Sequence, residues 1–298
     1  MYNVIDNERK IDADTLKKDR NFVVFSSLKD FFCPVWSKNF SIKYVQTGSE
    51  RYHLNGNFYE IKAGEYLLTN GESEGTVEID NKELVNGICI NIIPGVLSEV
   101  VASFKQPGTA FSDLSLDNFF TTGDFLESQY KSRDTSLGKF LSGLGSLSDI
   151  ENGNNPSFNA EFYYTLSEKI VTDNIPVYKQ LQAIRTVKQS TKKDLLKRVY
   201  RGRDYIDFNF RKSISIENIA REAMVSEYHF FRLFKAVFGI SPHQYIISKR
   251  LTFANEMLKK KGFRVSDAAI ESGFSDIYSF SKAFKKYYCI SPSELQVR

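Results

Sequence analysis

The sequence predicts an α+β protein in which an N-terminal β-barrel and a helical segment precede an all-α C-terminal domain with two helix-turn-helix units. Three observations predict this class: short apolar runs between glycine turns, a change to helical periodicity near Pro94, and an internal repeat near the C-terminus. They divide the chain into an arm (1–20), a barrel region (21–110), a helical linker region (111–193) and a C-terminal domain (194–298).

The composition is that of a globular chain of about two domains. Its 298 residues are 42% hydrophobic and 26% charged, which argues against disorder. No apolar run approaches the ~18 residues that span a bilayer. The polar N-terminal stretch also lacks a signal-peptide core, so we expect a cytoplasmic protein. Its three cysteines lie far apart without C-x-x-C spacing, which suits a reducing compartment and argues against a zinc site.

Charge is divided unevenly along the chain. Residues 195–298 hold 19 basic and 10 acidic side chains, whereas residues 1–194 hold 21 basic and 26 acidic ones. A basic C-terminal third joined to an acidic remainder is typical of a nucleic-acid-binding module fused to another domain. Many basic domains bind nothing, so the charge alone does not decide the function.

From Asn21 to about Ile93, short apolar runs alternate with turns. Asn55-Gly56 between two such runs is typical of a type I′ hairpin. Strands are expected at 22–25, 40–45, 51–54, 58–61, 66–68, 76–79 and 87–92. Many short strands at spacings of about 8–12 residues predict a barrel or a sandwich.

Helical periodicity dominates residues 94–193. Two apolar stripes at helical spacing run through residues 137–147 and 158–170. Pro176 is expected to open a further helix, because proline suits the first helical turn. The polar run at 188–193 is the predicted linker to the C-terminal domain.

A repeat occupies residues 213–298. The second copy follows the first at an offset of 50 residues, and upstream the offset falls to 49, so the second copy has one extra residue at the start of its long helix. The matched pairs are Phe230 and Phe280, Phe234 and Phe284, and Lys235 and Lys285 at the offset of 50, and Ile216 and Val265, Ala220 and Ala269, and Ser226 and Ser275 at the offset of 49.

Each copy is predicted to form a helix-turn-helix unit. A short helix, at 216–223 or 265–272, is followed by a tight turn. A serine, Ser226 or Ser275, is then expected to cap the longer helix beside an acidic residue. The longer helices are expected to bury Phe230, Leu233, Phe234, Val237 and Phe238 in the first copy, and Phe280, Ala283, Phe284, Tyr287 and Tyr288 in the second.

The face opposite each apolar stripe carries side chains that suit DNA. Arginine and lysine donate to guanine edges and phosphates, while aromatic rings and isoleucine contact thymine methyl groups. A solvated helix face is the ordinary alternative for one helix, but two matching faces in a basic region favour DNA binding. The candidate DNA-binding residues are Tyr228, His229, Phe231, Arg232 and Lys235 in the first unit, and Ile277, Tyr278, Ser281, Lys282, Lys285 and Lys286 in the second.

One helix, at 242–260, is predicted between the two copies. At ~1.5 Å per residue it is roughly 28 Å long. Successive major grooves on one face of DNA recur at ~34 Å. The helix therefore suits two recognition helices in adjacent grooves, and one chain is expected to bind double-stranded DNA without a partner.

Residues 195–297 resemble the DNA-binding domain of the AraC/XylS family of transcription regulators. The likeness rests on Ile219-Ala220, Ser226…Arg232-x-Phe234-Lys235, Gly239-Ile-Ser-Pro-x-x-Tyr245, Arg250-Leu251-x-x-Ala254, Gly273-Phe274-Ser-Asp276 and Phe280-Ser-Lys-x-Phe284-Lys285. It implies two units bound to adjacent major grooves, RNA polymerase as a partner, and activation as the commoner mode. It also places Tyr228, His229, Phe231 and Arg232, and Ile277, Tyr278, Ser281 and Lys282, at base-reading positions.

Two positions depart from the family pattern. Cys289 stands where the family usually has glycine at a helix end, and such a position often needs positive φ. The last turn is therefore expected to be strained or differently built. Ala268 replaces a larger aliphatic residue and is expected to leave a smaller core there.

The strand-then-helix order of the N-terminal half is similar to the cupin-like barrel and helical pair of many family members. That resemblance implies a small-molecule effector in the barrel and a homodimer formed through the helices. The candidate ligand-binding residues, each of which also suits a core or surface role, are Trp36, Tyr44, Arg51, Tyr52, Tyr59 and Tyr66.

Two other function classes fit the sequence less well. A metal-dependent cupin enzyme needs about two or three histidines and a carboxylate, but only His53 lies in the N-terminal half. No nucleophile–base pair is evident, so no catalytic residue, metal or cofactor is expected. A DNA-compacting protein would spread its basic residues, which the acidity of residues 1–194 disfavours. The prediction is a bacterial-type, ligand-responsive activator that reads DNA sequence and has no membrane association.

Overall fold

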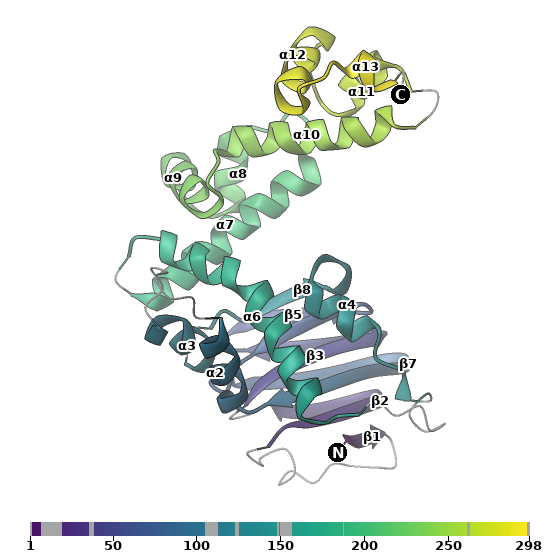
Figure 1. Cartoon of the computed structure of the whole chain (residues 1–298), viewed down its shortest axis with the longest axis vertical. Coiled ribbons are helices and arrows are strands. Elements are labelled where there is room, and N and C mark those ends of the chain that lie inside the picture. Colours follow the sequence, from purple (N-terminus) through teal and green to yellow (C-terminus); the bar gives the residue numbers. More distant parts are fainter. Residues whose placement is uncertain are drawn as a thin grey trace. The chain divides into compact units, whose positions relative to one another are not determined.

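In the computed structural model of the chain, the residues described are 2–6, 20–35, 39–104, 113–122, 125–147, 149, 157–186, 188–260 and 263–296. Contacts divide the chain into two units, residues 1–178 and 179–298. The first unit holds a β-sheet with helices, whereas the described part of the second unit is helical (Figure 1). The predicted α+β class is confirmed.

The described strands of the first unit form one eight-stranded sheet. Its path is β1-β2-β7-β3-β6-β8, and β4 pairs with β5 and β7 beside that path. The strands are β1 (Tyr2–Asp6), β2 (Phe22–Val35), β3 (Phe40–Thr47), β4 (Ser49–Leu54), β5 (Asn57–Lys62), β6 (Glu65–Thr69), β7 (Gly75–Ile92) and β8 (Ser128–Lys131). Every predicted strand lies within one of them, and those predicted at 76–79 and 87–92 are the two ends of β7.

Residues 2–6 depart from the predicted N-terminal arm, because they form β1. This strand runs parallel to β2, with Tyr2 opposite Val23 and Asp6 opposite Ser27. The pairing satisfies the backbone groups along the edge of β2, which would otherwise lie open. The remainder of the predicted arm, residues 7–19, lies outside the described residues.

Strands β2 and β7 are long and pair with each other along nearly their whole length, so both extend through the two ends of the sheet. Phe22 lies opposite Asn91 at one end and Val35 opposite Gly75 at the other, with a register shift after Leu28. Because β5 lies against β3 and β6, the sheet curls around an apolar core. Its path runs from β1 to β8 without closing into a ring among the described strands. The predicted barrel is therefore an open, curled sheet.

The hairpin between β4 and β5 has the predicted turn. Asn55 and Gly56 both have positive φ, 48° and 76°, as a type I′ turn requires at both central positions. Pairing then proceeds from Leu54 opposite Asn57 to Ser49 opposite Lys62. The prediction made from the Asn-Gly dipeptide is confirmed.

In the described residues four α-helices accompany the sheet: α2 (Pro94–Ser103), α3 (Asp113–Thr121), α4 (Ser136–Ser142) and α6 (Ala160–Ala183). The prediction that Pro176 opens a helix is wrong, because Pro176 lies inside α6. Proline removes one backbone hydrogen bond. The buried face nevertheless continues across it, from Ile170 to Val177 and Leu181, and this packing favours one continuous helix. In the described part of the chain, no helix is long and apolar enough to cross a membrane.

The helices of the second unit are α7 (Gln189–Asn209), α8 (Ile216–Glu222), α9 (Glu227–Phe238), α10 (Pro242–Leu258), α11 (Val265–Glu271), α12 (Ile277–Tyr288) and α13 (Pro292–Gln296). The pairs α8–α9 and α11–α12 are the two predicted helix-turn-helix units, and α10 lies between them (Figure 1). The polar run predicted as a linker is instead the start of α7, where buried Leu195 and Leu196 hold the first turns in the fold.

Candidate nucleic-acid interface and ligand pocket

Helices α9 and α12 are fixed by phenylalanines at matching positions. Phe230, Phe234, Phe280 and Phe284 are fully buried. The core of the first helix-turn-helix unit is so tight that a Cβ on Gly202 of α7 would lie 2.3 Å from the ring of Phe230. This packing orients the opposite face of each helix toward solvent.

One member of the predicted second stripe is exposed. Tyr287 keeps 53% of its surface exposed, so its predicted burial is wrong. The next residue, Tyr288, takes the inner position: its ring lies 4.7 Å from that of Phe284 and packs against the apolar cluster.

The N-caps of α9 and α12 lie one position apart relative to the repeat. Ser226 caps α9 and accepts from the His229 N–H at 3.4 Å, as predicted. In the second helix-turn-helix unit the cap is Asp276. Its carboxylate accepts from the Ser279 N–H at 2.7 Å and from the Ser279 hydroxyl at 2.8 Å. The prediction of Ser275 as the cap is wrong because the extra residue of the second copy moves the helix start. The Ser279 hydrogen bonds lower the pKa of the Asp276 carboxyl.

The turn before α9 is held by the helix that precedes the repeat. Met224 has a positive φ of 53°, and the matching Gly273 of the second unit has 89°. Arg198 of α7 donates to the Met224 carbonyl at 2.7 Å. A non-glycine residue is rare in this conformation. The hydrogen bond from Arg198 therefore stabilises a turn that the second helix-turn-helix unit forms with glycine.

The predicted DNA-binding residues gather on the outer faces of α9 and α12. Tyr228 and Tyr278 are the most exposed of the rings, at 72% and 75%. The guanidinium of Arg232 lies 5.6 Å from the centroid of the Tyr228 ring, which restrains its direction. The other exposed members are His229, Phe231, Lys235, Ile277, Lys282, Lys285 and Lys286, and Ser281 is half-buried. Each face thus combines cations with exposed apolar surface.

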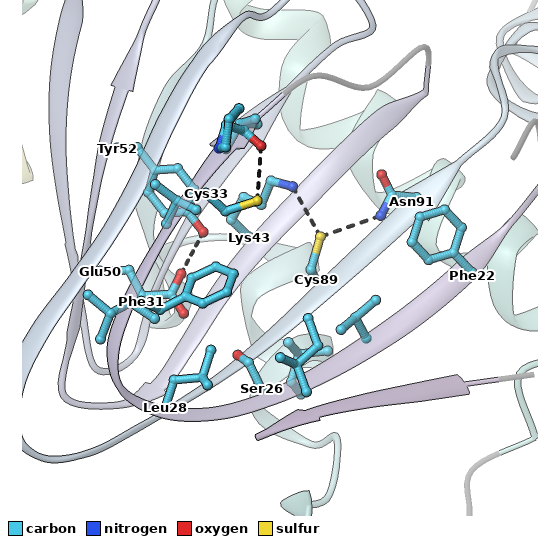
Figure 2. Close-up of a pocket in the computed structure, with 17 residues that line it drawn as sticks. Phe22, Ser26, Leu28, Phe31, Cys33, Lys43, Glu50, Tyr52, Cys89 and Asn91 are labelled. Carbon is cyan, nitrogen blue, oxygen red and sulfur yellow. Dashed lines mark hydrogen bonds between the residues drawn. The ribbon is translucent and has the colours of Figure 1, made fainter. Parts of the chain in front are cut away.

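A pocket lies in the concave face of the sheet in the first unit (Figure 2). Its volume is about 130 Å³, close to the ~150 Å³ of a cavity that holds benzene. Apolar side chains from β2 and β7 form most of its wall. The polar groups that face it include Lys43, Glu50, Tyr52, Cys89 and Asn91.

The polar groups of this pocket form two clusters. Lys43 Nζ donates to Cys89 Sγ at 3.1 Å, and Asn91 Nδ2 donates to the same sulfur at 3.4 Å. The Tyr52 hydroxyl donates to Glu50 at 2.5 Å. Burial raises the pKa of the Glu50 carboxyl, although the Tyr52 hydrogen bond and the charge of Lys43 oppose the shift.

Of the predicted ligand-binding residues that the structure describes, only Tyr52 lines this pocket. Tyr44 is buried with its hydroxyl toward Ser142, and Tyr66 stacks on Tyr130. Tyr59 packs at the edge of the core cluster, and Arg51 forms long ion pairs of 3.8 and 3.9 Å at the surface. Trp36 lies outside the described residues.

Sequence reasoning missed Lys43, Glu50 and Cys89 as pocket residues. The available signal was a charged side chain inside an otherwise apolar strand, as with Lys43 between Ile42 and Tyr44. Their meeting depends on how β3, β4 and β7 register beside one another, which a single strand does not reveal. In the described residues no cluster of three or more histidine, cysteine or carboxylate side chains is arranged to hold a metal ion.

Comparison with known proteins identifies the second unit. Residues 219–298 match a helix-turn-helix domain family. The chain is 37% identical over 93 residues to the probable transcriptional regulator LumQ of Photobacterium leiognathi, covering 31% of this chain and 38% of LumQ. It is 34% identical over 91 residues to the lactose operon transcription activator of Staphylococcus xylosus, covering 30% and 33%.

A shorter relative is covered over most of its length. The probable transcription factor PqrA of Proteus vulgaris is 31% identical over 85 residues, covering 28% of this chain and 70% of PqrA. Among solved structures, a probable AraC family transcriptional regulator from Rhodopseudomonas palustris is 27% identical, covering 34% of this chain and 96% of that one, with a TM-score of 0.33.

The matched region spans 38% of LumQ and 33% of the lactose operon activator, so the chain covers only about a third of each relative. The residues that match the helix-turn-helix family model, 219–298, coincide with the repeated units rather than with the sheet. On this evidence the chain belongs to the AraC/XylS family of transcriptional regulators.

Proposed function

We propose that this protein is a transcription activator that recognises a specific double-stranded DNA sequence through α9 and α12 and responds to a small molecule bound in its N-terminal sheet. The observation that carries the proposal is the repetition of one exposed face. Tyr228 and Arg232 in the first unit recur as Tyr278 and Lys282 in the second, with their cores intact behind them.

The exposed groups match what base edges and phosphates offer. Arg232 donates in the fork geometry that guanine O6 and N7 accept, and the methyl group of thymine suits Phe231 and Ile277. Lys235, Lys285 and Lys286 suit phosphates, which position a recognition helix without reading sequence. A phenylalanine exposed by 37% on a helix otherwise well packed is explained when DNA covers it.

The pocket in the sheet supports a response to an effector. Apolar walls with a few convergent polar groups are the usual form of a small-molecule site. Its size suits a compact molecule with an apolar body and a group that accepts a hydrogen bond from Lys43.

Activation, contact with RNA polymerase, and a homodimer formed through the N-terminal region are parts of this proposal that rest on the family. The lactose operon relative is named an activator. A bacterial regulator of this kind acts on chromosomal DNA in the cytoplasm.

The test of DNA recognition is selection of bound sequences from a random double-stranded pool with the full chain. We expect one motif of two blocks about 10 bp apart, one block for each recognition helix. A pool that stays random while binding falls steeply with salt would replace this proposal by nonspecific, electrostatic binding.

The test of the effector is a screen of compact molecules by thermal shift of the full chain, because a bound ligand stabilises the folded state. A pocket-filling variant, Val24→Phe, is expected to lose the shift that the wild type shows. The matched control, Tyr228→Ala, lies outside the pocket and should keep it. A ligand that binds the filled variant as tightly as the wild type would exclude this pocket as its site.

A further inference from the structure

A cleft of about 940 Å³ lies within the second unit, between residues 182–186 and one side of α9. It involves a segment that precedes α7 and lies outside the matched helix-turn-helix region. The residues that matter for its chemistry are Arg185, Leu195, His229, Arg232, Leu233 and Lys235.

The segment that forms one wall is held in place. Ile184 is only 1% exposed, and Leu195 and Leu233 are also buried. Four residues before Ile184, Gln180 accepts a hydrogen bond from the Tyr200 hydroxyl of α7. Arg185 is therefore an exposed side chain on an anchored backbone.

The charged side chains that the structure describes along the cleft are all cations. Arg185, Arg232, Lys235 and the imidazole of His229 line it, and none of its lining residues that the structure describes carries a carboxylate. The ion pairs among the described residues include none of Arg185, Arg232 and Lys235. Within the described part of the chain, these cations are therefore available to an anion from outside it.

The position of the cleft beside α9 indicates which anion it meets. An α-helix with its side chains is about 10–12 Å across, and the major groove is about 12 Å wide. A recognition helix thus fills the groove, and groups along its flank face the sugar-phosphate backbone. Arg185 lines the same cleft as His229 and Lys235 of α9.

We propose that Arg185 binds a backbone phosphate of the DNA strand that borders the groove read by α9. The guanidinium fork matches two phosphate oxygens, with His229 and Lys235 as neighbouring donors. This extends the DNA interface to a residue outside both helix-turn-helix units, and it rests on the proposed DNA recognition. Arg185 contributes affinity on every sequence and no base preference.

The experiment measures the affinity of the full chain for its selected site and for random DNA across a salt series. Arg185→Gln is expected to weaken binding to both DNAs about fivefold near 0.15 M salt, and to reduce the slope of log K against log salt by about one. Lys188→Gln is the matched control, because Lys188 is an exposed cation of the same segment that does not line the cleft.

Three outcomes would overturn the inference: unchanged affinity in Arg185→Gln, an equal loss in Lys188→Gln, or an altered selected motif. Unchanged affinity would mean that Arg185 does not contact a phosphate. An equal loss in Lys188→Gln would mean that any positive charge in this segment has the same effect. An altered motif would mean that Arg185 contacts a base. Inorganic phosphate added at constant ionic strength is expected to weaken wild-type binding no more than chloride does. A stronger effect would mean that the cleft takes free phosphate. If the wild type selects no motif at all, the proposed function fails instead.

Discussion

Cys289 ends α12 in the same left-handed conformation in which Gly239 ends α9. The φ angles are 61° and 75°, and each N–H donates at 2.9 Å to the carbonyl of the residue four positions earlier. The repeat thus preserves the backbone conformation and the hydrogen bond while changing the residue. Cys289 therefore carries the positive φ expected of a glycine position, and the last turn is built as in the first copy rather than differently.

Cys289→Gly should stabilise the second unit by about 1 kcal/mol, because glycine adopts positive φ without a Cβ clash. Cys289 is exposed, so little packing is lost. The measurement is the urea midpoint of the C-terminal transition in the full chain. Cys289→Ala is the control, since it removes the thiol but keeps the Cβ. Equal midpoints for the glycine and alanine variants would show that the conformation carries no strain.

Arg232→Ala should weaken binding to the selected site by about 1–3 kcal/mol with little change in stability, because an exposed side chain that reads a base is lost. Fluorescence anisotropy on the selected site and on a site mutated in one block measures this. Arg221→Ala is the control, since Arg221 is an exposed arginine on α8 paired with Glu217. Unchanged affinity in Arg232→Ala would remove this residue from the base-reading set.

Phe230 and Phe231 are adjacent and should behave in opposite ways. Phe230 is fully buried against α7, so Phe230→Ala should destabilise the helical unit at residues 179–298 by about 3–5 kcal/mol through a cavity. Phe231→Ala should leave the unfolding midpoint nearly unchanged and weaken specific DNA binding. Urea unfolding together with anisotropy separates the two. A large stability loss in Phe231→Ala would assign that ring to the core.

Glu50→Gln should stabilise the first unit at neutral pH. Burial raises the pKa of Glu50 above its ordinary value of 4.5. Between that value and the raised one the folded state holds a proton that the unfolded state has released, so stability falls as pH rises. Glutamine avoids this loss and still accepts from Tyr52. Thermal unfolding from pH 4 to 8 should show a benefit that grows with pH and vanishes near pH 4.5. A constant benefit would exclude this titration.

The helical repeat was predictable because its signals are local. Caps, turns and stripes lie within a few residues of one another, so Ser226, Phe230 and Phe234 already define a helix and its buried face. One error there came from an insertion, because one extra residue moved the cap from Ser275 to Asp276. Pro176 was assigned by its local preference, which the buried face of α6 overrides.

The pocket was not predictable in the same way. Its residues come from strands that pair across long stretches of sequence, and a shift of register by one position reverses which side chains face inward. Tyrosines were sensible candidates by composition, yet Tyr66 fills the core and Tyr52 alone reaches the pocket. Nothing in the sequence was a reason to select Arg185 either, because it precedes the repeat at residues 213–298.

The long strands β2 and β7 have a consequence for how the chain folds. Their ladder joins Phe22 to Asn91 and Val35 to Gly75, so neither half of the sheet is complete until distant segments meet, and such closure is slow. The helices of the second unit pair with near neighbours along the chain and need no comparable search. Refolding is therefore expected in two phases, with the helical unit, although synthesised last, reaching its native structure first.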